Sequence, residues 1–294
     1  MNVRALFSLA VFGLLLLTGC GAGSPPQANL AGNWLLVGPM PTTELPLTPV
    51  TNVRLAMTFD VIGNNISAYG YVDWPCDVAD QSGIVVSSAS FGVSATGTVE
   101  DGGRFTLQTA AGDPGSLSIQ GKAPQPGSGE WSGTYNMSYT LPFGVCSGSS
   151  SGLIAATAFP LINGIYDGTA QIVTAGIPKG KPITIQATLK QSGTVINPAT
   201  GLSTPSDILL EGSVQVAGSS CFKSGTTGVM PLSAVEGDLV LANFTMDDGS
   251  TLELQGTLID AVEGTIDADF VGVAGGKCAG IYQTTGFTRQ AQVR

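Results

Sequence analysis

Apolar and polar residues alternate along almost every segment of the chain after residue 30, and this feature most constrains the fold. A period of two is the pattern of half-buried antiparallel strands, whose successive side chains lie on opposite faces of a sheet. The alternation is clearest over residues 53–61, 131–141, 183–189 and 251–258. Turn sequences rich in Gly, Asn and Asp separate such runs, and no helical period follows residue 20. The sequence therefore predicts an all-β protein.

The two halves of the chain resemble one another, which predicts a tandem repeat. A Gly-x-aromatic triplet opens each half, at Gly32–Trp34 and at Gly164–Tyr166. The same offset of 132 residues separates these triplets and separates Cys146 from Cys278 near the ends of the halves. A unit of about 130 residues is a common domain size.

Each half contains about eight strand-like runs joined by short connections. Eight sequential antiparallel strands can close into an up-and-down barrel, which leaves no exposed sheet edge. We therefore expect one β domain over residues 30–160 and its internal repeat over residues 161–294. A β-sandwich of two sheets is the alternative.

The Gly-x-aromatic openings resemble the first strand of lipocalin- and streptavidin-type barrels, the calycins. Arg289 in the expected last strand suits the lipocalin pattern, in which a late arginine packs over that aromatic residue. The first half has no arginine in its last strand, so it departs from the pattern there. The resemblance implies a carrier that holds a small apolar ligand inside one barrel.

The N-terminal segment has the features of an export signal. Arg4 precedes an apolar run over Ala5–Leu17, which is the length of a signal-peptide core, whereas a membrane-spanning helix needs about 20 apolar residues. Leu17-Thr18-Gly19-Cys20 resembles the lipobox of bacterial lipoproteins. The resemblance implies that residues 1–19 are removed and that Cys20 is joined to a diacylglycerol and acylated, for example with palmitate. The alternative is an ordinary secretory signal peptide with an unmodified Cys20.

The resemblance to lipoproteins also implies a location in the bacterial cell envelope. Residues 20–29 are rich in Gly, Ser and Pro and are expected to form a short tether between the lipid anchor and the first domain. In Gram-negative lipoproteins an Asp after the cysteine favours the inner membrane. Gly21 stands there, which favours the outer membrane over the inner one.

The charge and composition exclude several classes of function. The formal charge is −10, and only 11% of residues are charged, against roughly 25% in ordinary domains. So few cations provide no basic footprint for nucleic acid and no polybasic patch for anionic lipids. Histidine is absent, which excludes His-dependent triads and the usual His-rich zinc sites. We expect no catalytic residues, no metal site and no cofactor.

The cysteines predict two disulfides. With Cys20 lipidated, four cysteines remain, an even number in an oxidising compartment. A repeat that folds as its own unit should close its own bridge, which predicts Cys76–Cys146 and Cys221–Cys278. The alternative is four buried free thiols, since cysteine is also a common core residue.

Two pairs of side chains are candidate sites. Tyr69 and Tyr71 share one strand face and could present an aromatic platform to a sugar or an apolar ligand, although ordinary packing is the alternative. Asp267 and Asp269 would lie about 6.6 Å apart on one strand face, with Asp260 and Glu263 before them. Such carboxylates could serve a glycosidase, but their alternation with apolar residues favours a solvated sheet face.

These observations lead to one functional expectation and two alternatives. We expect a membrane-anchored envelope lipoprotein with a non-enzymatic binding or structural role. Its partners would be the membrane, through the lipid anchor, and an envelope protein, a glycan or a small apolar ligand. The alternatives are a calycin-like carrier and a carboxylate-dependent glycosidase.

Overall fold

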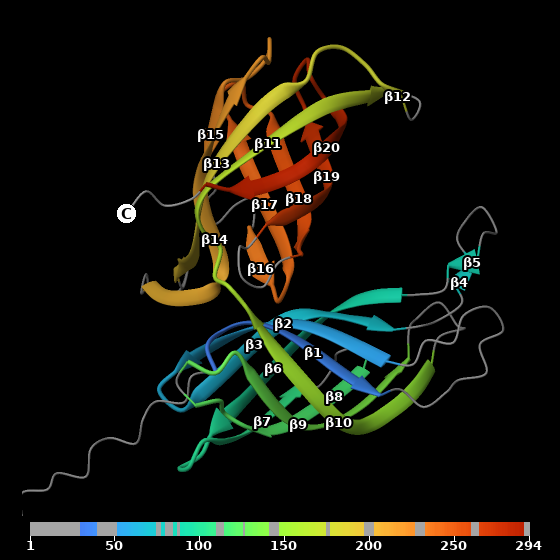
Figure 1. Ribbon diagram of the computed structural model, residues 1–294, viewed down its shortest axis with the longest axis vertical. Coiled ribbons are helices and arrows are strands. Elements are labelled where there is room, and N and C mark those ends of the chain that lie inside the picture. Colours follow the sequence, from blue (N-terminus) through green and yellow to red (C-terminus); the bar gives the residue numbers. More distant parts are fainter. Residues whose placement is uncertain are drawn as a thin grey trace, which may run out of the picture.

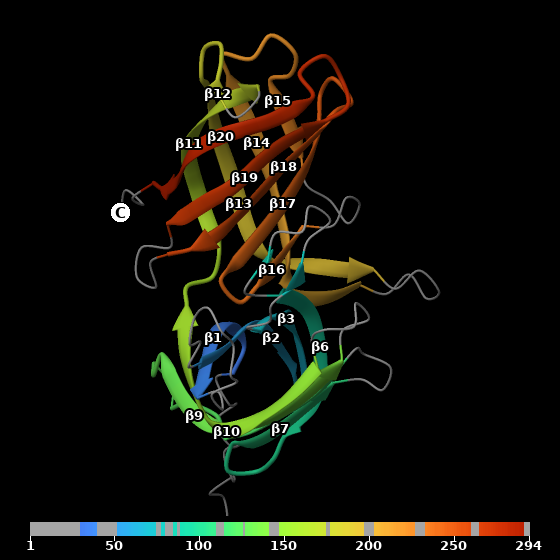
Figure 2. The ribbon, with the colours of Figure 1, turned by 90° about the vertical axis from the view of Figure 1, so that its right-hand side faces the viewer.

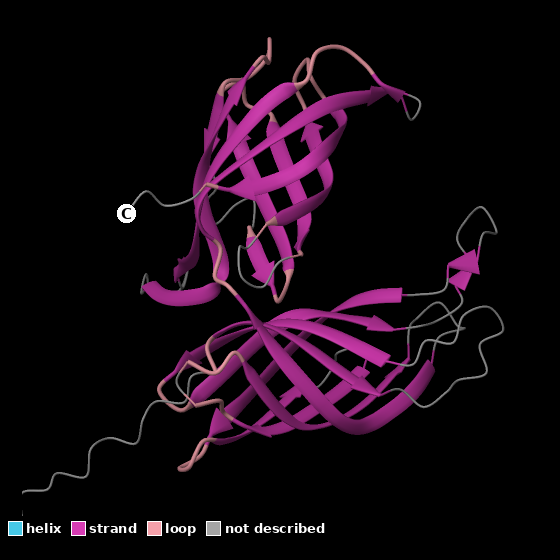
Figure 3. Cartoon of the chain, in the orientation of Figure 1, coloured by secondary structure: helices cyan, strands magenta, loops and turns pink. Residues whose placement is uncertain are grey.

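A computed structural model shows a chain built of β-strands (Figure 1, Figure 3). It describes residues 30–39, 52–74, 78–79, 85–86, 89–109, 115–125, 127–140, 147–174, 177–196, 203–226, 233–259 and 265–290. The regular structure within these ranges is strand alone, so the prediction of an all-β protein is confirmed.

The first domain, barrel 1, is a closed ring of eight antiparallel strands. Each strand pairs with its neighbours in the chain, and the first pairs with the last, so the barrel is of the expected up-and-down type and not a sandwich. A two-stranded sheet of β4 (Val78–Ala79) and β5 (Val85–Val86) lies in the connection between the third and fourth strands of the ring. The ring is made of β1 (Gly32–Pro39), β2 (Asn52–Ile62), β3 (Asn65–Trp74), β6 (Ala89–Val99), β7 (Arg104–Thr109), β8 (Gly115–Lys122), β9 (Glu130–Thr140) and β10 (Ser147–Phe159).

The second domain, barrel 2, repeats this order of strands and closes through pairing of β11 with β20. Its ring is made of β11 (Asn163–Thr174), β13 (Ile183–Ile196), β14 (Ser203–Ala217), β15 (Ser224–Thr226), β17 (Leu239–Met246), β18 (Thr251–Leu258), β19 (Ile266–Ala274) and β20 (Gly280–Arg289). Two short strands lie off the ring, β12 (Ile177–Pro178) beside β11 and β16 (Ala234–Glu236) between β14 and β17.

The repeat extends to the backbone conformation at the start of each barrel. Gly32 and Gly164 open β1 and β11 with φ values of 122° and 130°, a region that only glycine occupies without strain. The aromatic residue two positions later, Trp34 or Tyr166, is buried in the core of its barrel. The same local geometry therefore starts both domains.

The inward face of barrel 1 is filled with side chains. The alternating residues predicted to face inward, such as Leu55 and Met57, are buried. Four aromatic rings pack together with centroids 5.0 to 6.4 Å apart, mostly edge to face, which is a favoured geometry for aromatic pairs. These rings belong to Trp34, Phe59, Phe105 and Trp131.

The two ends of barrel 1 differ in the length of their connections. Because the strands run alternately up and down, successive connections lie at opposite ends. We call one end the closed end, where β1 begins and where residues 63–64, 100–103 and 123–129 join strands. We call the other end the mouth, where the strands are joined by residues 40–51, 75–88, 110–114 and 141–146.

Barrel 2 stands on the side wall of barrel 1, with the two barrel axes running in different directions (Figure 1, Figure 2). Only Pro160, Leu161 and Ile162 connect β10 to β11. The part of barrel 2 that meets barrel 1 is formed by β14, by β16 and by the turn that follows β16. β14 and β16 contact β2, and β16 also contacts β3.

One of the two predicted disulfides lies within the described residues. Cys221 and Cys278 are bonded, with their Cα atoms 6.1 Å apart, and they join the β14–β15 connection to the β19–β20 connection. Cys76 and Cys146 lie outside the described residues, as does Cys20.

Candidate functional site

An ion-pair cluster lies on the surface where the two barrels meet. Arg54 points outward from β2, and its guanidinium donates hydrogen bonds to Asp73 at 2.7 Å and to Asp238 of barrel 2. The guanidinium also donates to the Tyr71 hydroxyl at 2.6 Å, and that hydroxyl in turn donates to Asp238 at 2.9 Å. The side chain of Asp238 is only 2% exposed, whereas those of Arg54 and Asp73 are both 31% exposed. Asp238 is therefore a buried carboxylate held by two donors from the other barrel.

A second polar cluster lies beside the first and is also shared between the barrels. The Thr58 hydroxyl lies 2.7 Å from the Val235 carbonyl oxygen, and it accepts a hydrogen bond from the Gly237 amide at 2.9 Å. The side-chain amides of Asn33 and Gln191 bond to one another at 2.9 and 2.6 Å. Thr58, Asn33 and Gln191 are almost fully buried, and hydrogen bonds between the barrels satisfy part of their polar groups.

The backbone of barrel 2 approaches that of barrel 1 closely at Gly237. This residue has a φ of +67°, and a Cβ atom added to it would lie 2.3 Å from the Met57 nitrogen. Glycine is therefore required both by the turn and by the contact with β2. We call the contacts of residues 235–238 with β2 and β3 the junction.

Burial changes the ionisation of the junction residues. Loss of solvent raises the pKa of Glu236 above its ordinary value. It also raises the pKa of Asp238, against the opposing effects of the Arg54 guanidinium and the Tyr71 hydroxyl. The pKa of Tyr71 is likewise raised, first by burial. The junction therefore holds two carboxylates that are harder to ionise than in water.

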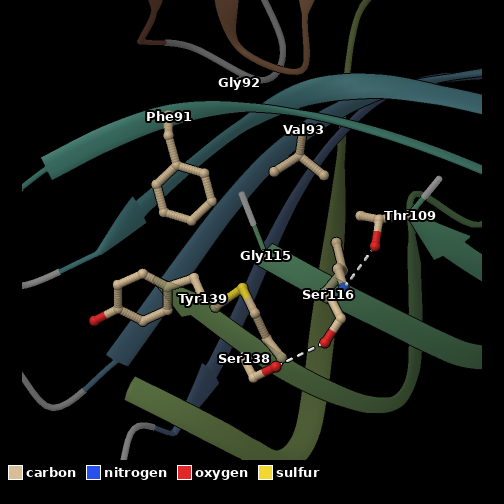
Figure 4. Close-up of a pocket in the computed structure, with 10 residues that line it drawn as sticks. Phe91, Gly92, Val93, Thr109, Gly115, Ser116, Ser138 and Tyr139 are labelled. Atoms are coloured by element: carbon tan, nitrogen blue, oxygen red, sulfur yellow. Dashed lines mark hydrogen bonds between the residues drawn. The ribbon is translucent and has the colours of Figure 1, made fainter. Parts of the chain in front are cut away.

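The mouth of barrel 1 contains a small apolar recess (Figure 4). Phe91 and Tyr139 stack across it with ring centroids 5.7 Å apart, and burial raises the pKa of Tyr139 to about 12. The recess is also lined by Val93, Leu117 and Met137, and its volume is about 10 Å³, room for about one water molecule. Among the described residues, the pairing of β7 with β6 reaches Ala95, and the part of β6 from Ala89 to Ser94, beside the recess, has no partner in β7.

The candidate residues from the sequence lie in different places. Tyr69 and Tyr71 share the outward face of β3, as expected, but Tyr71 belongs to the junction. Asp267 is exposed at the start of β19, while Asp260, Glu263 and the side chain of Asp269 lie outside the described residues.

Arg289, which the sequence places in the last strand, is directly opposite Tyr166 in the pairing of β11 with β20. In the described ranges, no group of three or more Cys, Asp or Glu side chains could hold a metal ion. The part of the chain that the structure describes also contains no helix with the length and apolar composition of a membrane span.

Sequence reasoning missed the junction. Thr58 alternates with inward apolar residues and reads as a solvent-facing position, yet barrel 2 covers it completely. The one sequence signal was the Glu236-Gly237-Asp238 turn, which places two acids around a glycine. That pattern is also common in exposed turns, so it could not indicate the contact.

Comparison of the chain with protein families, with characterised proteins and with solved structures found no match.

Proposed function

We propose that the protein is a lipid-anchored lipoprotein of the bacterial envelope, in which two β-barrels serve a non-enzymatic binding or structural role. The observation that carries this proposal is the Leu17–Cys20 box directly after an apolar segment of signal-peptide length. The disulfide Cys221–Cys278 supports it, because such bonds persist in oxidising compartments outside the cytosol.

The anchor would hold barrel 1 by its closed end. Residues 20–29 lead directly to Leu30 and β1, which begins at that end. Ten fully extended residues span at most about 35 Å, so the closed end would stay near the lipid surface. The mouth of barrel 1 would then point away from the point of attachment.

The test is the chemical state of Cys20. Intact-mass analysis of the protein purified from bacterial membranes should give a chain that begins at Cys20 and carries a diacylglycerol. The Cys20→Ser variant should lack lipid and should stay unprocessed or leave the membrane fraction. A wild-type chain recovered without lipid would contradict the proposal.

In a Gram-negative host, the membrane with which the protein fractionates tests the predicted location. With Gly21 after the cysteine, the protein should fractionate with the outer membrane, whereas Gly21→Asp should move it to the inner membrane. Gly21→Ser is the matched control and should not move it. The same distribution for all three chains would show that this position does not direct sorting.

A calycin-like carrier is the second candidate, and the apolar recess at the mouth of barrel 1 is the observation that favours it. Met137 in its lining is a flexible side chain that can make room for a ligand. A fluorescent apolar probe should bind, and Val93→Trp, which fills the recess, should abolish binding. If a probe binds equally well to both proteins, the recess is not the site.

A further inference from the structure

A second hollow lies on the outer surface of barrel 1, at its closed end. It is formed by the outward side chains of β7, β8 and β9, and its volume is about 470 Å³, within the range of about 300 to 1,000 Å³ for ligand sites. β8 lies four strands from β2 around the ring of eight, so this groove is on the wall opposite the junction. Neither the junction nor the mouth uses it.

The floor of the groove is a row of uncharged polar side chains. Thr106, Gln120 and Thr134 are direct neighbours across β7, β8 and β9. Two hydroxyls and an amide in one row can donate and accept several hydrogen bonds to one ligand.

Two cations stand side by side at one end of this row. Arg104 and Lys122 are direct cross-strand partners, and both are exposed. Like charges in this arrangement destabilise a sheet. Glu100 also lines the groove, yet among the described residues neither cation makes an ion pair with any acid.

The contrast with barrel 2 makes the pair unusual. Lys190 in β13 has the acid Glu211 as its cross-strand partner, which is the favourable arrangement. The whole chain has only 11 Lys and Arg residues against 21 acids. Here two of them stand together with neither an acidic cross-strand partner nor an ion pair, which suggests that an anion supplies the missing charge.

We propose that this groove binds the phosphate group of a phosphorylated, hydroxyl-bearing ligand. The planar guanidinium of Arg104 suits two oxygens of one phosphate, and Lys122 adds a point charge from the neighbouring strand. Thr106, Gln120 and Thr134 would contact the hydroxyl groups next to the phosphate. A phosphate monoester, with a charge near −2, balances both cations. A phosphodiester such as that of a lipid headgroup, with a charge of −1, balances the net positive charge left by the two cations and Glu100.

Two sources share this chemistry, a soluble sugar phosphate and the headgroup of a membrane lipid. The groove lies at the end of barrel 1 to which the expected tether is joined, so lipid headgroups would be within reach. The site itself rests on the contacts of the groove, and only the lipid source rests on the proposed anchoring.

The first experiment titrates the full chain, in an uncharged detergent, with glucose 6-phosphate and follows binding by calorimetry. Arg104→Gln and Lys122→Gln should each weaken binding by about tenfold, as loss of one charge-assisted contact predicts. Lys190→Gln removes the same charge elsewhere and should change nothing. Both groove residues are exposed, so circular dichroism of each variant should match that of the wild type.

Two further ligands test whether the groove recognises the phosphate group. Glucose, which lacks the phosphate, should not bind, and glucuronate should bind more weakly than glucose 6-phosphate. The phosphate assignment is overturned if glucuronate binds as tightly, or if Lys190→Gln weakens binding as much as the groove variants do.

The second experiment identifies the source in vesicles that carry the full chain. The chain is treated with a water-soluble acetylating reagent that reacts with amines. Mass spectrometry then measures the acetylation of Lys122, with Lys190 as the internal control. Protection of Lys122 by phosphatidylglycerol but not by phosphatidylcholine, lost in Arg104→Gln, assigns the lipid source. Protection of Lys122 only by added glucose 6-phosphate assigns the soluble source. The proposed phosphate site would then stand even if the chain carries no lipid. Equal acetylation of Lys122 in every condition, with no binding in the titration, overturns the site.

Discussion

Single residues decide whether the two barrels can meet, and Gly237 shows this most clearly. A side chain there would enter the backbone of β2, and its φ of +67° is itself unfavourable for other residues. Thr58 and Asp238 complete the contact with hydrogen bonds that cross from one barrel to the other. Each of these groups would be exposed or unsatisfied in an isolated barrel.

We predict that Gly237→Ala destabilises the protein by about 2 to 4 kcal/mol, because overpacking at the β2 backbone adds to the cost of the positive φ. Gly249→Ala is the matched control. Gly249 has a φ of +81°, but its added Cβ would meet nothing within 4 Å, so that variant should lose only about 1 kcal/mol. Denaturant unfolding measures both. Equal losses would mean that the close approach to β2 is not a constraint.

Because Glu236 is buried at the junction, we predict that its stabilising contribution to the fold decreases as the pH rises. Its pKa is raised in the folded protein, so the folded state holds the proton more tightly than the unfolded state does. The contribution of Glu236 to the unfolding free energy is fully present below the ordinary pKa of about 4.5. It is lost as the pH rises through the raised pKa of the folded state. Unfolding free energies measured between pH 4 and pH 8 should fall less in Glu236→Gln than in the wild type. Parallel curves for the two proteins would refute this effect.

At the scale of elements, the sequence predicted the strands and their closure because alternation and turn residues report directly on them. The inward faces of β2, β9, β13 and β18 are the predicted ones. The short strands β4, β5, β12 and β16 were not predicted, since two or three residues cannot display a period. The junction was missed because alternation shows which face points outward but not whether another domain covers that face.

The disulfides join connections between strands, and their positions correspond in the two barrels. Cys221 and Cys278 lie in the connections that correspond, strand for strand, to those containing Cys76 and Cys146. We therefore expect Cys76–Cys146 to form in barrel 1. Non-reducing peptide mapping should recover two linked peptides, one from each barrel, and a peptide linking Cys76 to Cys20 would contradict the pairing.

The Cys221–Cys278 bond closes a segment of 57 residues. By chain entropy it should contribute about 4 kcal/mol, mainly by restricting the unfolded state. Replacing both cysteines by serine should lower the unfolding free energy of barrel 2 by about that amount. Replacing both Cys76 and Cys146 by serine should lower the unfolding free energy of barrel 1 in the same way.

At the scale of the whole molecule, the junction joins two domains that each have their own core. Two independent barrels joined by three residues would unfold in separate steps. The buried Asp238 changes this expectation, because separating the barrels removes both of its donors, Arg54 and Tyr71, and also exposes Thr58, Asn33 and Gln191. Each barrel is therefore stabilised by the presence of the other.

We predict that the wild-type chain unfolds in one cooperative transition and that Arg54→Met splits it into two. Removing one partner of a buried ion pair leaves the other charge uncompensated and typically costs about 3 to 5 kcal/mol. Asp73→Asn is the control, because Asp73 is 31% exposed and surface ion pairs contribute only about 0 to 1 kcal/mol. Calorimetry should show a single peak for the wild type and for Asp73→Asn, but two peaks for Arg54→Met. Two peaks in the wild type would mean that the junction does not couple the barrels, and the ion pair between Arg54 and Asp238 would then orient the domains without stabilising them.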